Sequence, residues 1–147
     1  GSGARIGRDL LQETLLAHDG IRRGSALSDA ILKRFNGNPG EMVEFTTAAK
    51  PVDYGAFAPM VFAAAAEGDA VAGRLVDRVV AEVEETLAVF DLAAPERLCL
   101  LGGLAGLYAP LLSERYRAIL HPPLGDAIAG AVQMAVRKFG KPGGGHG

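Results

Sequence analysis

The sequence predicts a mostly α-helical chain that contains one buried strand. Apolar residues recur at helical spacing in several segments, of which residues 70–90 are the most regular. Residues 98–101 are instead an unbroken apolar run that Gly102 and Gly103 close, which is typical of a buried strand followed by a tight turn. A length of 147 residues, 49% of them apolar and 22% charged, is enough for one domain with its own core.

The composition excludes several classes of function. The net charge is −2 and Lys and Arg form no cluster, so neither nucleic acid nor an anionic membrane is an expected partner. Cys99 is the single cysteine and lies in the predicted strand, which excludes a disulfide framework and a cysteine metal set. No apolar run approaches the roughly 20 residues of a membrane span, and no signal peptide is visible. We therefore expect a cytoplasmic protein.

Two helices are predicted near the N-terminus. Apolar residues at helical spacing extend over residues 6–15, and Gly20 stands where this helix would end. Ser25 or Ser28 can cap the second helix. Turn-forming residues at 36–40 end it.

The middle of the chain is expected to alternate irregular and helical segments. Residues 42–47 include β-prone side chains and predict a short strand, and residues 50–55 are expected to form a loop. An alanine-rich helix is predicted over residues 56–67. Gly68 suits the position just after its end, and Asp69 suits the N-cap of the next helix, which has the clearest apolar stripe in the chain.

The last third of the chain contains the predicted strand and two further helices. Pro110 can open the first of these helices, and Asp126 can cap the second. Residues 140–147 are expected to be a flexible tail, so residues 1–139 are interpreted as one partial domain. A lone buried strand leaves its backbone N–H and C=O groups without partners. Its neighbours must come from a partner chain or from sequence outside these residues.

The strand–glycine turn–helix unit at residues 97–106 is the strongest candidate for a functional site. Glycine lets the backbone adopt a positive φ and lets a ligand lie on the main chain, and N–H groups in such a turn suit phosphates or a nucleotide. A tight connection without a ligand fits the same residues. Leu101 stands where a G-x-G-x-x-G motif needs glycine, and no Walker lysine follows. No residue is a persuasive general base or nucleophile, and no metal-ligand spacing is found.

Four stretches carry a resemblance to a known family. They are GSGARIGRDLL at 1–11, AFAPMVFAAAAEGDAVAGRLV at 56–76, LLGGLAG with YAPLLSERY at 100–116, and PPLGDAIAGAVQMA at 122–135. In this order and spacing they resemble the C-terminal half of the BadF/BadG/BcrA/BcrD-type ATPases and their relatives, the N-acetylglucosamine and glucosamine kinases. These proteins belong to the actin-like, sugar-kinase and Hsp70 ATPase superfamily.

The resemblance implies an α/β fold of the ribonuclease H-like, actin-type ATPase kind, with ATP and Mg²⁺ as cofactors. By position, Ser2 would lie by the amino-sugar pocket. The residues that would lie against adenine and ribose are Gly102, Gly103, Leu104 and Gly106. No catalytic residue or metal ligand is carried over, because the family's base and phosphate loops have no counterpart here. The missing N-terminal part of the same protein is then a partner, and a homodimer is expected.

The implied function is phosphoryl transfer from ATP to N-acetylglucosamine or glucosamine, with the present residues inactive by themselves. Ala4 and Arg5 replace the Tyr-Trp often seen in these sugar kinases, so the identity of the sugar is left open. An alternative is the ATPase activator of a 2-hydroxyacyl-CoA dehydratase type of system, which needs exposed thiolates for an iron–sulfur cluster. A helical interaction module without enzymatic activity is a third interpretation.

Overall fold

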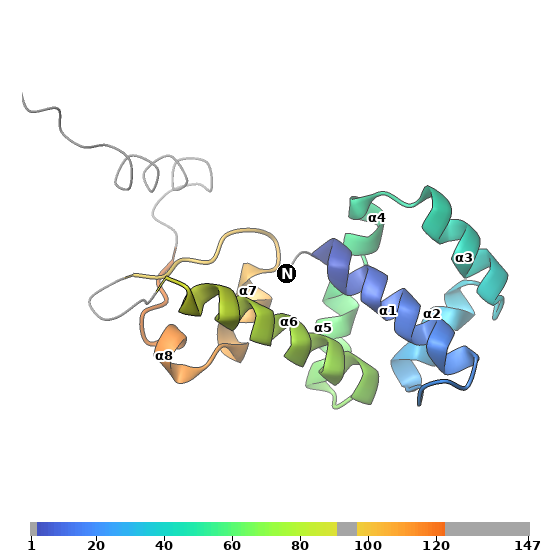
Figure 1. Ribbon diagram of the computed structural model, residues 1–147, viewed down its shortest axis with the longest axis horizontal. Coiled ribbons are helices and arrows are strands. Elements are labelled where there is room, and N and C mark those ends of the chain that lie inside the picture. Colours follow the sequence, from blue (N-terminus) through green and yellow to red (C-terminus); the bar gives the residue numbers. More distant parts are fainter. Residues whose placement is uncertain (1–2, 91–96, 123–147) are drawn as a thin grey trace, which may run out of the picture. The chain divides into compact units, whose positions relative to one another are not determined.

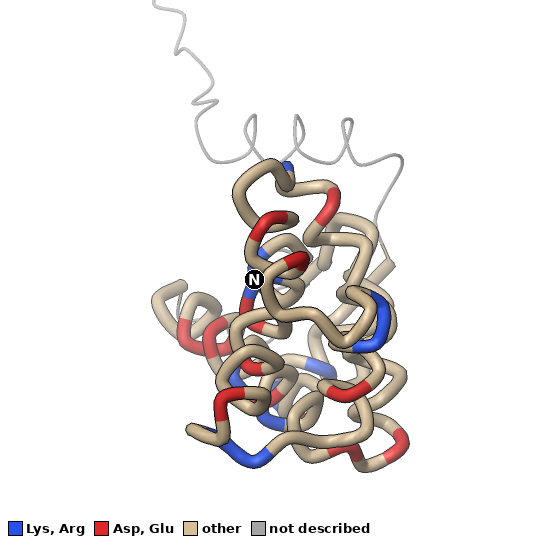
Figure 2. The backbone as a smooth tube through the Cα atoms, turned by 90° about the vertical axis from the view of Figure 1, so that its right-hand side faces the viewer, with Lys and Arg blue, Asp and Glu red and all other residues tan. Residues whose placement is uncertain are grey.

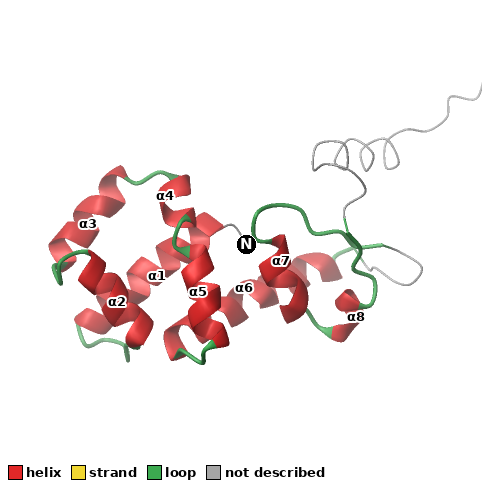
Figure 3. Cartoon of the chain, turned by 180° about the vertical axis from the view of Figure 1, so that it is seen from behind, coloured by secondary structure: helices red, strands yellow, loops and turns green. Residues whose placement is uncertain are grey.

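A computed structural model describes residues 3–90 and 97–122. The chain divides into two compact units, residues 1–91 and 92–147. The described helices of the first unit, seen in Figure 1, are α1 (Gly3–His18), α2 (Ala26–Arg34), α3 (Pro39–Ala48), α4 (Pro51–Gly55), α5 (Ala58–Ala66) and α6 (Ala70–Ala88). The second unit contains α7 (Ala105–Tyr108), the 3₁₀ helix η1 (Ala109–Leu111) and α8 (Glu114–Arg117). Figure 3 shows helices and loops but no strand over the described residues.

Helix α1 is the centre of the first unit, because α2, α4, α5 and α6 all pack against it. Its buried side chains, Ile6, Leu10 and Leu11, lie on one face. Helix α6 contributes Leu75 and Val79 from the stripe that the sequence predicts. The long apolar helices therefore form the core, as their periodicity indicates.

Charged side chains tie α1 to α6 along the edge of this core. The guanidinium of Arg5 contacts both carboxylate oxygens of Glu82, at 2.5 and 2.6 Å. One turn further along, Asp9 lies 3.9 Å from Arg78. Figure 2 shows acidic and basic residues interspersed along the described backbone. Such partly exposed pairs contribute little energy each and mainly fix how the two helices are aligned.

The predicted helix boundaries are confirmed where a capping residue is present. Ser25, and not Ser28, is the N-cap of α2, while the Ser28 hydroxyl oxygen accepts a hydrogen bond from the backbone N–H of Ser25 at 2.8 Å. Gly20 and Gly68 have φ of +72° and +87° just after α1 and α5, the conformation that favours glycine at a helix end.

Two predictions for the middle of the chain are wrong. Residues 42–47 lie inside α3, and most of the predicted loop at 50–55 is the short helix α4. The Asn38 side chain caps α3 by accepting the N–H of Gly40 at 2.9 Å, and Pro39 pre-sets the first helical φ. The Asp53 carboxylate accepts the N–H of Lys50 at 2.7 Å across the start of α4. These capping interactions outweigh the weak β propensity of the residues between them.

The predicted strand at 97–101 is also wrong, although the segment is extended at one residue. Leu98 donates its N–H to Ile119 and accepts the N–H of His121, both at 2.8 Å, which makes one isolated parallel bridge. The next step of a parallel ladder would need an N–H at position 123, and that residue is proline. Burial is correspondingly local: Leu98 is 8% exposed and Leu101 is 43% exposed.

A small core surrounds this bridge in the second unit. Leu98, Tyr108, Leu112, Tyr116 and Ile119 are its buried side chains. The helix predicted to open at Pro110 is divided into α7, η1 and α8 instead, with the proline in η1. The last predicted helix and the tail lie outside the described residues. The interpretation of residues 1–139 as one domain stays a prediction.

Candidate functional site

The glycine-rich turn at residues 102–106 forms as the sequence predicts. Gly102 has a φ of +109°, a conformation that disfavours any residue with a Cβ. Its carbonyl oxygen accepts the N–H of Ala105 at 3.1 Å, which closes the turn. Leu104 then begins α7 by accepting the N–H of Tyr108 at 3.1 Å. The turn is therefore defined by backbone hydrogen bonds and by one glycine with a positive φ.

The glycines of this turn face open space. A Cβ built on Gly102, Gly103 or Gly106 would meet no heavy atom within 4 Å. Neither close packing nor, at Gly103 and Gly106, a positive φ explains the choice of glycine. All three are exposed, and Leu104 beside them is half-buried. A main chain left uncovered in this way is accessible to a ligand as well as to solvent.

The buried side chains of the second unit hold the turn in place. Tyr108 and Tyr116 are 6% and 2% exposed, and the Arg115 guanidinium lies over the Tyr116 ring at 4.6 Å from its centroid. Because α7 ends at Tyr108, its first turn is anchored by an aromatic ring in the core. The turn thus leads into a short helix whose last residue is buried, although its own glycines are exposed.

The other predicted site residue is not placed. Ser2 lies outside the described residues, just ahead of α1. Within residues 3–90 and 97–122, no group of three His, Cys, Asp or Glu side chains could hold a metal ion. Cys99 is a half-buried free thiol, with Sγ 3.8 Å from the Leu100 carbonyl oxygen. The described residues therefore include the candidate nucleotide turn, and they include no cluster of metal-ligating side chains.

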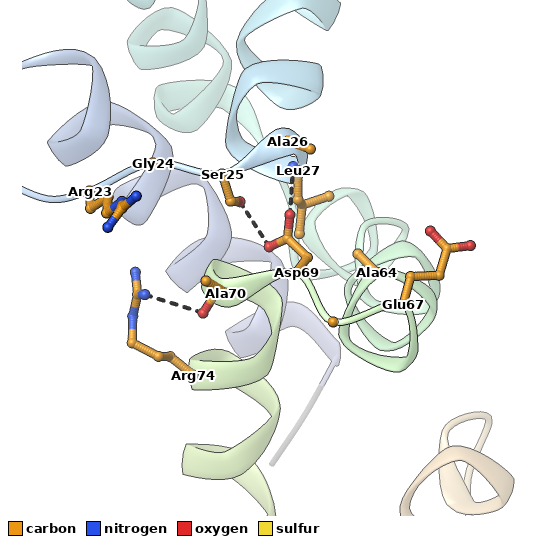
Figure 4. A pocket seen from close by; sticks show the side chains of 11 residues that line it. Arg23, Gly24, Ser25, Ala26, Leu27, Ala64, Glu67, Asp69, Ala70 and Arg74 are labelled. Atoms are coloured by element: carbon orange, nitrogen blue, oxygen red, sulfur yellow. Dashed lines mark hydrogen bonds between the residues drawn. The ribbon is translucent and has the colours of Figure 1, made fainter.

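Asp69 has a second role that the sequence does not predict. As expected, its Oδ1 caps α6 by accepting the N–H groups of Val71 and Ala72 at 3.0 and 2.9 Å. Its Oδ2 also accepts the N–H of Leu27 at the start of α2, at 2.9 Å, and the Ser25 hydroxyl donates to Oδ1 at 2.8 Å. One carboxylate thus joins the N-termini of two helices, as Figure 4 shows.

The environment of Asp69 keeps it ionised. Burial raises the pKa of this carboxyl group, but the backbone hydrogen bonds from Ala72 and Leu27, the Ser25 hydroxyl and the N–H of Val71 together lower the pKa below its ordinary value of 3.8. A depression of about 680 Å³ surrounds it, with Arg23 and Arg74 on the opposite wall in Figure 4. Because four donors already occupy the carboxylate, Asp69 is a structural anion and not a catalytic base.

Glu13 is a second buried carboxylate with a structural role. Its side chain is 8% exposed and lies 2.6 Å from Arg22 and 3.5 Å from Arg74. The two arginines come from the segment after α1 and from α6. Glu13 therefore fixes that segment against α6, and no sequence motif indicates this pairing, because its partners are 9 and 61 residues away.

Known proteins resemble this chain both in sequence and in structure. No family model matches the chain. A protein named glucosamine kinase GspK, from Vibrio cholerae serotype O1, is 37% identical over 142 residues, which are 97% of this chain and 47% of that protein. A crystal structure of a protein assigned as an N-acetylglucosamine kinase, from Chromobacterium violaceum, is 28% identical with a TM-score of 0.77. It is matched over 90% of this chain and 46% of its own length.

The chain therefore spans about half the length of each protein it matches. None of the described helices is both long and apolar enough to cross a bilayer. Sequence and structure agree on the same class of relative, which confirms the resemblance seen in the four stretches of sequence. The chain is a homologue, over almost its whole length, of about half of an amino-sugar kinase of the glucosamine and N-acetylglucosamine kinase type.

Proposed function

We propose that this chain is the adenosine-binding part of an ATP-dependent amino-sugar kinase. The observation that carries the proposal is the 37% identity to a glucosamine kinase over 97% of the chain. The exposed turn supports it, because adenine and ribose could lie directly on the main chain of Gly102 and Gly103, with Leu104 and Gly106 beside them. ATP as the donor is also in keeping with a cytoplasmic location.

The reaction would transfer the γ-phosphoryl group of ATP to a hydroxyl of the sugar. Such transfer depends on positioning the two substrates and on Mg²⁺, which neutralises charge on the phosphates. The turn would contribute by positioning the nucleotide. The described residues include no carboxylate set able to hold a metal. Mg²⁺ would therefore be bound by the ATP phosphates and by groups outside these residues. The catalytic base would also come from outside these residues.

The sugar would bind near Ser2, at the start of α1. We infer glucosamine or N-acetylglucosamine from the names of the two matched proteins. Ala4 and Arg5, in the first turn of α1, make this end differ from the Tyr-Trp pattern of the family. Discrimination between the two sugars is therefore a matter for measurement.

A coupled assay of ADP formation tests this function. The protein expressed from the full reading frame that contains the chain is expected to release ADP with at least one of the two sugars. The 147-residue chain by itself is expected to release none, because no catalytic base is assigned to it. Absence of sugar-dependent ADP release by the folded full-frame protein would refute the kinase assignment.

A further inference from the structure

Charged contacts join α1 to α6 at intervals of four residues along each helix. In order along α1, these contacts are Arg5–Glu82, Asp9–Arg78 and Glu13–Arg74. Their N–O separations are 2.5, 3.9 and 3.5 Å in the same order. Residues four apart lie on one face of a helix, so each helix presents a line of charges to the other. The line on α1 is positive, negative, negative, and the antiparallel line on α6 is its complement.

This order of charges opposes any slip of α1 along α6. A slip of one helical turn, about 5.4 Å, would place Arg5 opposite Arg78 in one direction. In the other direction it would place Asp9 opposite Glu82. Both slips bring like charges together, which repel. The charges on α6 therefore help to set where α1 begins.

The Arg5–Glu82 pair is the contact of this line that secures the first turn of α1. Residues 3–5 precede Ile6, the first buried residue of the helix. The Arg5 Nη1 and Nη2 atoms donate to the two carboxylate oxygens of Glu82 at 2.6 and 2.5 Å, and such two-point contact fixes direction as well as distance. The backbone of the same turn lies near α4, since a Cβ added to Gly55 would be 3.8 Å from the Ala4 nitrogen. The first turn of α1 is thus held against both α4 and α6.

We propose that Arg5 is a positioning residue for the sugar, and that it acts through Glu82 and not by touching the sugar. This inference rests on the proposed function, under which the sugar binds at the start of α1. Both terminal nitrogens of the Arg5 guanidinium contact a carboxylate that is 77 positions away on α6. The side chain would therefore keep the start of α1 in the place that the sugar requires.

The KM for the sugar tests this role in the full-frame protein, with whichever of glucosamine and N-acetylglucosamine releases ADP. Glu82→Gln removes the charge that Arg5 contacts and leaves α1 unchanged. We expect this KM to rise about two- to fivefold, because a partly exposed ion pair shifts the population of the correctly placed helix by that order. The kcat, the KM for ATP and the Tm should stay nearly unchanged. Glu85→Gln, which removes an exposed carboxylate from the same helix, is the matched control and should alter none of these values.

A double-mutant cycle separates positioning from direct contact. Arg5→Gln should raise the KM for the sugar by the same factor as Glu82→Gln. The variant with both changes should raise it no further, as expected of two residues that act only as a pair. A larger effect of Arg5→Gln, multiplied by that of Glu82→Gln in the double variant, would show that Arg5 contacts the sugar itself and would overturn the proposal.

Other outcomes separate this inference from the proposed function. An unchanged KM for the sugar in Glu82→Gln, with an active wild type, would refute the inference alone. A parallel rise in the KM for ATP, or a large loss of Tm, would show that the pair only stabilises the fold, and would also refute it. A wild-type protein without sugar-dependent ADP release would refute the proposed function and this inference together.

Discussion

Asp69 accepts the backbone N–H of Leu27 at 2.9 Å while also capping its own helix, so one carboxylate connects the start of α2 to the start of α6. The two residues are 42 positions apart. Helix α2 is short, and only Leu27, Ser28 and Ile31 of its residues are buried. This carboxylate therefore adds a polar attachment to the few buried side chains of α2.

Asp69→Ala is expected to lower the free energy of unfolding by about 1–3 kcal/mol, since a cap and a further acceptor are lost together. From the sequence alone, asparagine should replace Asp69 almost without cost. The structure changes that expectation, because an asparagine amide has one acceptor oxygen and its NH₂ would face either Leu27 or the cap of α6. We expect Asp69→Asn to cost about 1 kcal/mol in urea unfolding. A neutral Asp69→Asn would show that the hydrogen bond to Leu27 contributes nothing.

The lowered pKa of Asp69 predicts a pH dependence with a definite sign. A carboxyl group whose pKa is lower in the folded state stabilises the protein above its ordinary, unfolded pKa of 3.8 and loses that contribution as the pH falls through the folded value. The stability difference between wild type and Asp69→Asn should thus be constant near neutral pH and shrink below about pH 4. Urea unfolding of both proteins from pH 3 to pH 7 would measure this, and a difference that grows on acidification would contradict it.

Gly7→Ala is expected to separate α1 from α4. A Cβ at this position would lie 1.9 Å from the carbonyl oxygen of Tyr54, a backbone atom that cannot move aside alone. We expect a loss of about 1–3 kcal/mol in the free energy of unfolding, as for other overpacked sites. Gly73→Ala in α6 is the matched control, because nothing lies within 4 Å of its Cβ, and it should be neutral or stabilise by up to about 1 kcal/mol. Similar losses at both positions would rule out the contact with Tyr54 as the cause.

Gly103→Val should weaken ATP binding by the full-frame protein and leave its Tm nearly unchanged. A Cβ at this position meets no heavy atom of the described residues within 4 Å beyond its chain neighbours, whereas a ligand lying on the turn would clash with the new side chain. Gly102→Val is the informative contrast, since its φ of +109° should destabilise the fold itself. Calorimetric titration with ATP and a thermal melt separate the two effects. Unaltered ATP affinity in a folded Gly103→Val protein would remove the turn from the site.

Local signals made much of the helical fold predictable. Ser25 and Asp69 mark helix starts by their own side-chain chemistry, and Gly68 marks an end. Helix α3 was not predicted because it buries little besides Met42, so it lacks an apolar stripe that could outweigh its β-prone residues. The capping side chain of Asn38 was the available signal.

Contacts between distant positions could not be predicted. The strand prediction for residues 97–101 failed because pairing is decided some twenty residues later, by the prolines after His121. The glycine turn was predictable, since glycine is the residue that most readily adopts the positive φ of a tight turn. The bridge from Asp69 to Leu27 and the pairing of Glu13 with Arg74 required the folded chain, because neither spacing corresponds to a local motif.

Pro122 and Pro123 also determine the register in which Leu98 is paired. If Leu98 slipped forward by two residues, it would need a hydrogen-bond donor at position 123, and proline has none. If it slipped back by two, it would need the N–H of Ile119, which already bonds to the carbonyl oxygen of Tyr116. Only one alignment of Leu98 therefore has a free N–H donor for its carbonyl oxygen, and this selection does not depend on how the side chains fit.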